Sequence, residues 1–232
     1  MLTVRKSDDR GKTKLDWLES RHSFSFGDYR DPAHVSFGPL RVINEDRIAP
    51  GGAFPPHSHS DMEIVTYILD GALEHRDSLG NAGIIHAGEI QLMSAGSGIE
   101  HAEVNASREH PVHLLQIWIL PSRDGVDPSY EQKLIDPVSM SNRFTRIAAP
   151  DPRATEVRLT QDAEIWAVKL DPDEEVVHSI EPGRRAWVQV ARGDVSVGSH
   201  RLVAGDAVGI LDESSVAIRA HAPSEVLLFD MA

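Results

Sequence analysis

The chain has 232 residues, of which 41% are hydrophobic and 25% are charged, and its formal net charge is −13. This length is sufficient for one or two globular domains with a substantial core. The acidic balance argues against direct binding to nucleic acid or to anionic membranes, because both carry negative charge. No apolar run approaches the roughly 20 residues of a membrane-spanning helix.

The chain contains no cysteine, which excludes disulfides and thiolate metal sites. Residues 1–10 lack the apolar core that a signal peptide requires. We therefore expect a cytoplasmic protein. Its acidic surface is compatible with binding to protein partners.

Three phenylalanines in the first part of the chain are candidates for the wall of an apolar substrate pocket. Phe24 and Phe26 alternate with Ser23 and Ser25, and such alternation on a strand places both rings on one face. Phe54 lies shortly before the first histidine pair. Plain core packing is the alternative interpretation for each ring.

Two short strings carry most of the chemistry: His57-Ser58-His59 and His101-Ala102-Glu103. Residues at i and i+2 of a strand share a face, so each string can offer two side chains to one ion. Three imidazoles and a carboxylate suit Fe, Ni, Cu, Mn or Zn and suit Mg or Ca poorly. We predict one divalent transition metal per chain, with iron as the first choice, held by His57, His59, His101 and Glu103.

Short apolar runs separated by turn residues continue along the chain, and helical periodicity is confined to residues 129–135. Asp70-Gly71 follows one such run and is typical of a hairpin turn. This pattern predicts an all-β sandwich or barrel. The main runs are 64–69, 83–86, 90–93, 113–120, 164–170, 175–180, 186–191, 194–197, 206–211, 216–219 and 226–229.

Residues 121–128 are rich in proline and charge and indicate the end of a domain. Glycines at expected hairpin turns recur in both halves, as at Gly71 and Gly193, and indicate two related units. We predict a metal-binding barrel over 1–128, followed over 129–232 by a connector and a second barrel without metal ligands. A strand over 142–147 is expected to begin the second barrel. The histidines of the second half show no i,i+2 pairing: His178, His200 and His221.

Two further polar residues are candidates for supporting the site without binding the metal. Gln116 is polar within an apolar run, which fits a side chain that orients a ligand or a water molecule. Glu63 follows the first histidine pair closely and is expected to support it. The other histidines of the first half are expected at the surface or hydrogen-bonded within strands: His22, His34, His75, His86 and His110. His113 lies on a run that can neighbour the site and is not assigned to it.

The spacing of these residues resembles the two cupin motifs, G-x5-HxH-x3-E-x6-G and G-x5-PxG-x2-H-x3-N. The closing glycine of the first motif comes one residue late, at Gly71, and Ser94 replaces the proline of the second. Two extra residues precede His101. In the general cupin pattern Glu63 would be a metal ligand.

The segments 17–29, 37–44, 57–64 and 93–103 resemble the signature of pirins, and the chain is similar to bacterial pirin-like quercetin 2,3-dioxygenases. The resemblance implies two jelly-roll-like cupin barrels and assigns the carboxylate ligand to Glu103 rather than Glu63. It also implies a dioxygenase that opens a flavonol such as quercetin with O₂ and releases CO, with Glu103 helping to deprotonate the substrate.

The partners implied are a small aromatic or enolic substrate and dioxygen. One alternative is a non-enzymatic, metal-dependent regulator or sensor that acts through protein partners, as eukaryotic pirins are described. A third interpretation is redox-neutral chemistry on the same scaffold.

Overall fold

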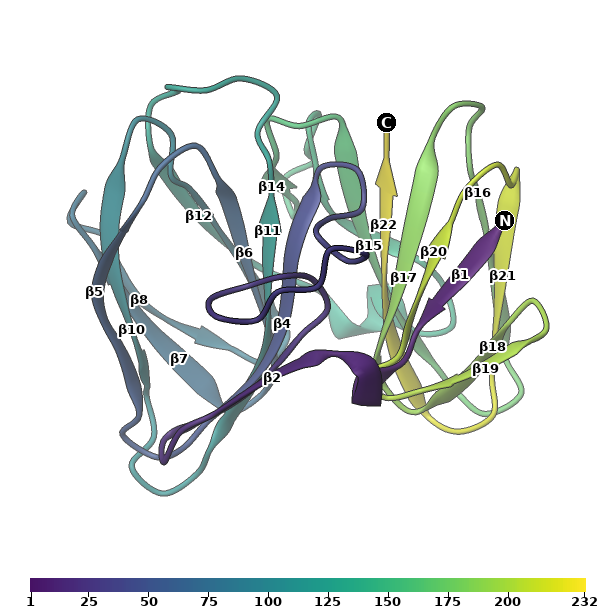
Figure 1. Ribbon diagram of the computed structural model, residues 1–232, viewed down its shortest axis with the longest axis horizontal. Coiled ribbons are helices and arrows are strands. Elements are labelled where there is room, and N and C mark those ends of the chain that lie inside the picture. Colours follow the sequence, from purple (N-terminus) through teal and green to yellow (C-terminus); the bar gives the residue numbers. More distant parts are fainter. The chain divides into compact units, whose positions relative to one another are not determined.

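The computed structural model describes residues 1–232, and its regular secondary structure is almost wholly β-strand (Figure 1). Its helical segments are two short 3₁₀ turns, Ser7–Asp9 and Pro137–Met140. No helix is long and apolar enough to cross a membrane. Contacts divide the chain into an amino-terminal unit, Gly11–Ile135 with Val157–Gln161, and a carboxyl-terminal unit, Met1–Arg10 with Asp136–Glu156 and Asp162–Ala232.

The amino-terminal unit contains two antiparallel sheets, with the strand orders β12-β9-β6-β11-β4-β3-β2 and β5-β10-β7-β8. Apolar side chains from both sheets, such as Ile68 and Leu73, form one buried cluster, as in a jelly-roll barrel. The strands of this unit are β2 (Gly11–Lys14), β3 (Leu18–His22), β4 (Leu40–Ile48), β5 (Ala53–His59), β6 (Glu63–Asp70), β7 (Ala72–Asp77), β8 (Ala82–His86), β9 (Glu89–Ser94), β10 (Ile99–Asn105), β11 (Val112–Ile119), β12 (Ser129–Leu134) and β14 (Val157–Arg158).

The carboxyl-terminal unit also contains two sheets, with the orders β1-β20-β17-β22-β15-β13 and β16-β21-β18-β19. Its core is dominated by valine, leucine and isoleucine from both sheets, such as Val188 and Ile218. The strands of this unit are β1 (Leu2–Arg5), β13 (Thr145–Ala149), β15 (Ala163–Leu170), β16 (Glu175–Ser179), β17 (Arg185–Arg192), β18 (Asp194–Val197), β19 (His200–Val203), β20 (Ala207–Ile210), β21 (Ser215–Ala220) and β22 (Ser224–Met231).

The two units repeat one topology. The order β5-β10-β7-β8 corresponds strand by strand to β16-β21-β18-β19, and β9-β6-β11-β4 corresponds to β20-β17-β22-β15. The equivalent hairpin glycines Gly71 and Gly193 both have a positive φ, +79° and +89°. The place that β12 takes beside β9 is taken beside β20 by β1, from the start of the chain. The predicted all-β fold of two cupin barrels is therefore confirmed.

Three local predictions differ from the structure. Most of the segment 129–135 forms strand β12 (Ser129–Leu134) instead of a helix, because pairing with β9 outweighs its weak helical periodicity. Strand β13 begins at Thr145, later than predicted. Strand β3 ends at His22. Phe24 lies in a bend and Phe26 in an isolated bridge with Tyr29, so the two rings do not share a strand face.

The division into domains after residue 128 stays a prediction. The contact units depart from that boundary in three places. Strand β1 belongs with the carboxyl-terminal unit, whereas β12 and residues Val157–Gln161 belong with the amino-terminal unit. The cytoplasmic location also stays a prediction.

The hairpin at Gly71 offers a test of the fold. Gly71 has φ +79°, and a Cβ there would lie 2.8 Å from the carbonyl oxygen of Pro111, whereas Gly80 has φ +91° and open space around it. Both substitutions by alanine incur the left-handed penalty of about 1–2 kcal/mol. Gly71→Ala adds a steric cost of about 1–3 kcal/mol. Urea unfolding should therefore show a larger loss of stability for Gly71→Ala than for Gly80→Ala, and equal losses would contradict the close approach.

Candidate metal centre

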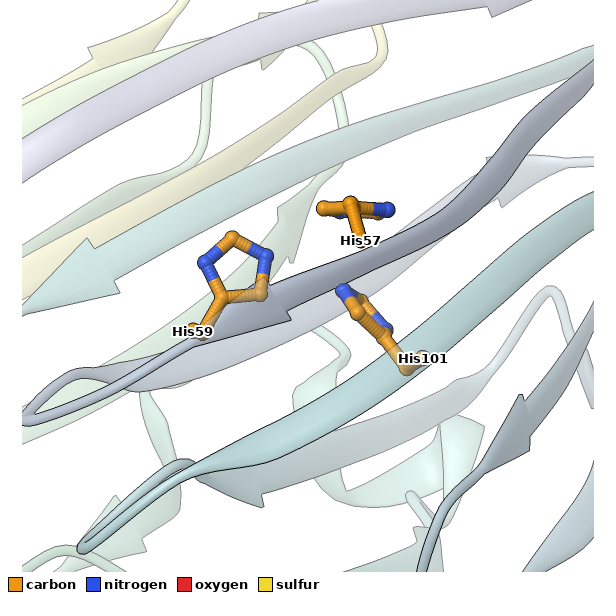
Figure 2. A group of neighbouring side chains, drawn as sticks. All are labelled: His57, His59 and His101. Carbon is orange, nitrogen blue, oxygen red and sulfur yellow. The ribbon is translucent and has the colours of Figure 1, made fainter.

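Three histidines meet where β5 and β10 pair. The antiparallel register sets His101 opposite His57 and Ile99 opposite His59. Figure 2 shows the rings of His57 and His59 on one strand and that of His101 on its neighbour, around a common space. Ring centroids lie 4.4 Å apart for His57 and His101, 5.0 Å for His59 and His101, and 4.8 Å for His57 and His59. The sequence-predicted histidines are thus brought together.

A bulge in this strand pair helps to aim the ring of His57. Between His101 and Glu103 the register shifts from His57 to Phe54, so β5 carries an extra residue at Pro55-Pro56. Prolines are tolerated at bulges because they have no N–H to pair. The Nδ1 of His57 lies 2.9 Å from the carbonyl oxygen of Pro55. That carbonyl only accepts, so in the neutral ring Nδ1 carries the proton and Nε2 has the lone pair that a metal requires.

The other two histidines are held in the neutral form. Burial, aided by the neighbouring His57, lowers the pKa of His59 to about 4 and that of His101 to about 3. The Nε2 atom of His101 is buried and has no hydrogen-bond partner. A buried nitrogen without a partner is costly unless a ligand occupies it. This atom, beside the imidazoles of His57 and His59, is the observation that fits a divalent transition metal.

Glu103 is 3% exposed, as deeply buried as His101 and more buried than His57 and His59. Burial raises the pKa of Glu103 to about 7 against the hydrogen bonds from Gln116, and the charge of Asp46 adds to the rise. Gln116 donates from Nε2 to both carboxylate oxygens, at 3.0 and 3.1 Å, and accepts from Thr66 Oγ1 at 2.9 Å. Gln116 therefore orients this carboxylate.

The potential ligands form two overlapping groups that share His101. In one group His57, His59 and His101 place donor atoms within 4.8 Å of one another, and in the other His75, His101 and Glu103 do so. Glu103 is therefore next to His101 but is not gathered with the histidines of β5. Its place in the ligand set stays a prediction. Both groups lie in the amino-terminal unit.

Glu63 belongs to neither group. Its side chain is fully buried and accepts hydrogen bonds from the backbone N–H of Thr160, at 2.9 and 3.0 Å, and of Gln161. Burial raises the pKa of Glu63 although these hydrogen bonds oppose the rise. In this structure Glu63 provides hydrogen-bond acceptors for the backbone N–H groups of the segment that follows β14.

The three predicted pocket phenylalanines lie in different surroundings. Phe24 is 2% exposed and lies in the core. Phe54 packs edge-on against Trp17 at 5.0 Å, and its ring is 6.4 Å from that of His57. Phe26 lines a cavity of about 730 Å³ together with Trp118. The ring of Trp118 contacts both Phe26, at 5.3 Å, and His59, at 4.9 Å.

Sequence reasoning missed several residues around the site. Trp118, Met62 and Arg41 line the same cavity as Phe26. The sequence offered one signal for them: Trp118 lies two residues after Gln116, the spacing of side chains on one strand face. His75 is fully buried beside His101, and its i,i+2 spacing to Asp77 could have indicated a pair. His113 contacts Glu45 and Arg47 and joins neither ligand group.

Comparison with known families covers both units. A family model described as Pirin matches residues 3–119, and a model described as the quercetinase C-terminal cupin domain matches residues 146–231.

Similar proteins match along the whole chain. A quercetin 2,3-dioxygenase of Escherichia coli (strain K12) is 44% identical over 231 residues, which are 100% of this chain and 99% of the relative. A pirin-like protein of Caulobacter vibrioides is 40% identical over 235 residues, covering 100% of both chains. The crystal structure of the bacterial pirin YhhW from Escherichia coli in complex with nickel(II) has a TM-score of 0.95 at 43% identity, covering 100% of this chain and 99% of that chain.

Metal content should follow the histidines of β5 and β10. We expect about one ion per chain, since the three-histidine group occurs once. His57→Ala and His101→Ala each remove a nitrogen ligand and should reduce the bound metal below detection by elemental analysis. His221→Ala is the matched control, because His221 lies in the carboxyl-terminal unit and its ring is hydrogen-bonded to Ser196. Two ions per chain, or metal loss in the control, would contradict this assignment.

Proposed function

The chain belongs to the pirin family, and from that premise we propose that it is a metal-dependent dioxygenase that cleaves flavonols such as quercetin. The proposal is carried by one observation, the cluster of three histidines beside a buried carboxylate with a raised pKa. The similar Escherichia coli protein that bears the name quercetin 2,3-dioxygenase supports the choice of reaction.

His57, His59, His101 and Glu103 would hold the metal. Three neutral imidazoles and one carboxylate leave a divalent site with a net charge near +1, which favours an anionic guest. The metal supplies Lewis-acid chemistry, which lowers the pKa of the substrate hydroxyl. Iron is the metal that we propose first, and nickel, the ion in the YhhW complex, fits the same donors, as do copper, manganese and zinc.

Glu103 would take the proton of the flavonol 3-hydroxyl. A general base works best when its pKa lies near the operating pH. Burial raises the pKa of Glu103 in the metal-free protein to about 7, and a bound cation would lower it from there. Gln116 holds both oxygens of Glu103, so the carboxylate accepts the proton without rearranging. Once deprotonated, the ring is electron-rich and open to attack by dioxygen.

The cavity beside Trp118 suits a flat aromatic guest. It is walled by Phe26, Trp118 and Met62, and its volume of about 730 Å³ lies in the range of small-molecule sites. Arg30 and Arg41 outnumber the one acidic residue of the wall, Asp31, and this positive balance favours an oxyanion. No histidine lines the cavity; Trp118 connects it to His59 by ring contact.

Isotope labelling tests the proposed reaction. Quercetin incubated with the metal-loaded protein under ¹⁸O₂ should give a ring-opened product with two labelled oxygens and one unlabelled CO per turnover, because the carbon that leaves keeps its hydroxyl oxygen. The anaerobic sample is the control and should show no turnover. Metal binding without turnover of any enolic substrate would overturn the proposal and favour a regulator that acts through protein partners.

Substitutions at Glu103 and Glu63 distinguish a catalytic carboxylate from a structural one. Glu103→Gln keeps the shape but removes the basic oxygen, so turnover should fall by about 10²-fold or more while some metal is retained. Glu63→Gln should retain the metal and most of the activity. It should lower the free energy of unfolding by about 1–3 kcal/mol, because a buried acceptor of backbone N–H groups is altered. If Glu63→Gln strips the metal while Glu103→Gln changes nothing, the general cupin ligand pattern applies instead.

A further inference from the structure

A fourth histidine, His75, lies behind the three-histidine cluster, on the far side of β10 from β5. Strand β10 pairs with β5 on one edge and with β7 on the other, so His101 has His57 opposite on one side and Asp77 on the other. His75 of β7 is 0% exposed. Its Nδ1 lies 3.5 Å from Nδ1 of His101, and its Nε2 lies 3.2 Å from Oδ2 of Asp77.

Asp77 is fixed as a hydrogen-bond acceptor. Its Oδ1 receives the backbone N–H groups of Leu79 and Asn81, each at 3.0 Å, and its Oδ2 receives the amide of Asn81 at 3.0 Å. Its side chain is fully buried. Since these neighbours are donors, the carboxylate accepts from His75 as well.

The proton positions follow from this acceptor. Because Asp77 accepts, His75 carries its proton on Nε2, and a neutral ring then has a bare Nδ1. The facing Nδ1 of His101 must supply the proton for that contact. A neutral His101 is then bare at Nε2, the buried atom that has no partner in the protein.

We propose that Asp77 and His75 form a positioning relay that fixes the tautomer and ring orientation of His101, so that its Nε2 faces the metal. Hydrogen bonding to the non-ligating nitrogen of a metal-bound histidine also raises the basicity of the ligand. Tyr130 stacks on His75 with ring centroids 5.0 Å apart and planes inclined by 30°, which holds the ring of His75 in the plane that the relay needs. The inference rests on the proposed metal site and does not depend on flavonol chemistry.

The relay also settles the role of the group formed by His75, His101 and Glu103. Both ring nitrogens of His75 are engaged, one by Asp77 and one by His101. His75 therefore has no free lone pair for an ion. We assign it as a positioning residue and not as a ligand.

The tautomers can be read directly in the metal-free protein. Long-range ¹⁵N–¹H correlation spectra of the histidine side chains at neutral pH should show the Nε2–H tautomer for His75 and the Nδ1–H tautomer for His101. In Asp77→Asn, which keeps the shape but can present an N–H to His75, both preferences should weaken. A wild-type His101 found as the Nε2–H tautomer would overturn the relay.

Metal affinity provides the second readout. In chelator competition with Ni²⁺, His75→Phe and Asp77→Asn should each weaken binding by about 10–100-fold, the usual effect of losing such a partner, while one ion still binds at saturation. His86→Phe is the matched control, since His86 is an exposed residue on the adjacent strand β8, and should leave the affinity unchanged.

Unchanged affinity in Asp77→Asn would overturn the relay, and complete loss of stoichiometric binding in His75→Phe with a folded protein would make His75 a ligand. Asp77→Asn keeps the proposal testable if His75→Phe fails to fold. Neither readout involves turnover, so a failed relay and a failed dioxygenase assignment give different results.

Discussion

The antiparallel pairing of β10 between β5 and β7 is the constraint on which the site depends. Its register places His101 opposite His57 on one edge and beside His75 and Asp77 on the other. A slip of one residue would turn His101 and Glu103 to the opposite face of the sheet. The hairpins that set this register and the bulge at Pro55-Pro56 are therefore as much a part of the metal centre as the side chains.

The two units share one topology, but only the amino-terminal unit has the candidate metal centre. In the carboxyl-terminal unit, β16 and β21 correspond to β5 and β10. Their buried positions hold Val176, Val216 and Ile218, and the partly buried His178 of β16 is engaged by Asp230 at 2.8 Å. The strand scaffold is the same, but its inward face is mainly aliphatic. Core packing thus replaces ligand chemistry at the same place in the fold.

Much of this could be predicted from the sequence. The i,i+2 spacing of His57 with His59 and the glycine turns are local signals, and they indicated a strand-borne cluster in a two-barrel fold. Phe24 and Phe26 were misplaced because alternation persists beyond the end of β3, where the backbone bends.

The relay and the surroundings of the two carboxylates could not be predicted in the same way. They depend on which strands become neighbours. Only the register of β7 against β10 brings His75 to His101, and only the return of residues 157–161 gives Glu63 its backbone partners.

A crystal structure of the metal-loaded protein, with the ion located by anomalous scattering, tests the arrangement of donor atoms most directly. The account predicts one ion bound to Nε2 of His57 and His101 and to a ring nitrogen of His59, with His75 still hydrogen-bonded to Asp77 and to Nδ1 of His101. An ion bound to His75, or one held by Nδ1 of His101, would contradict it.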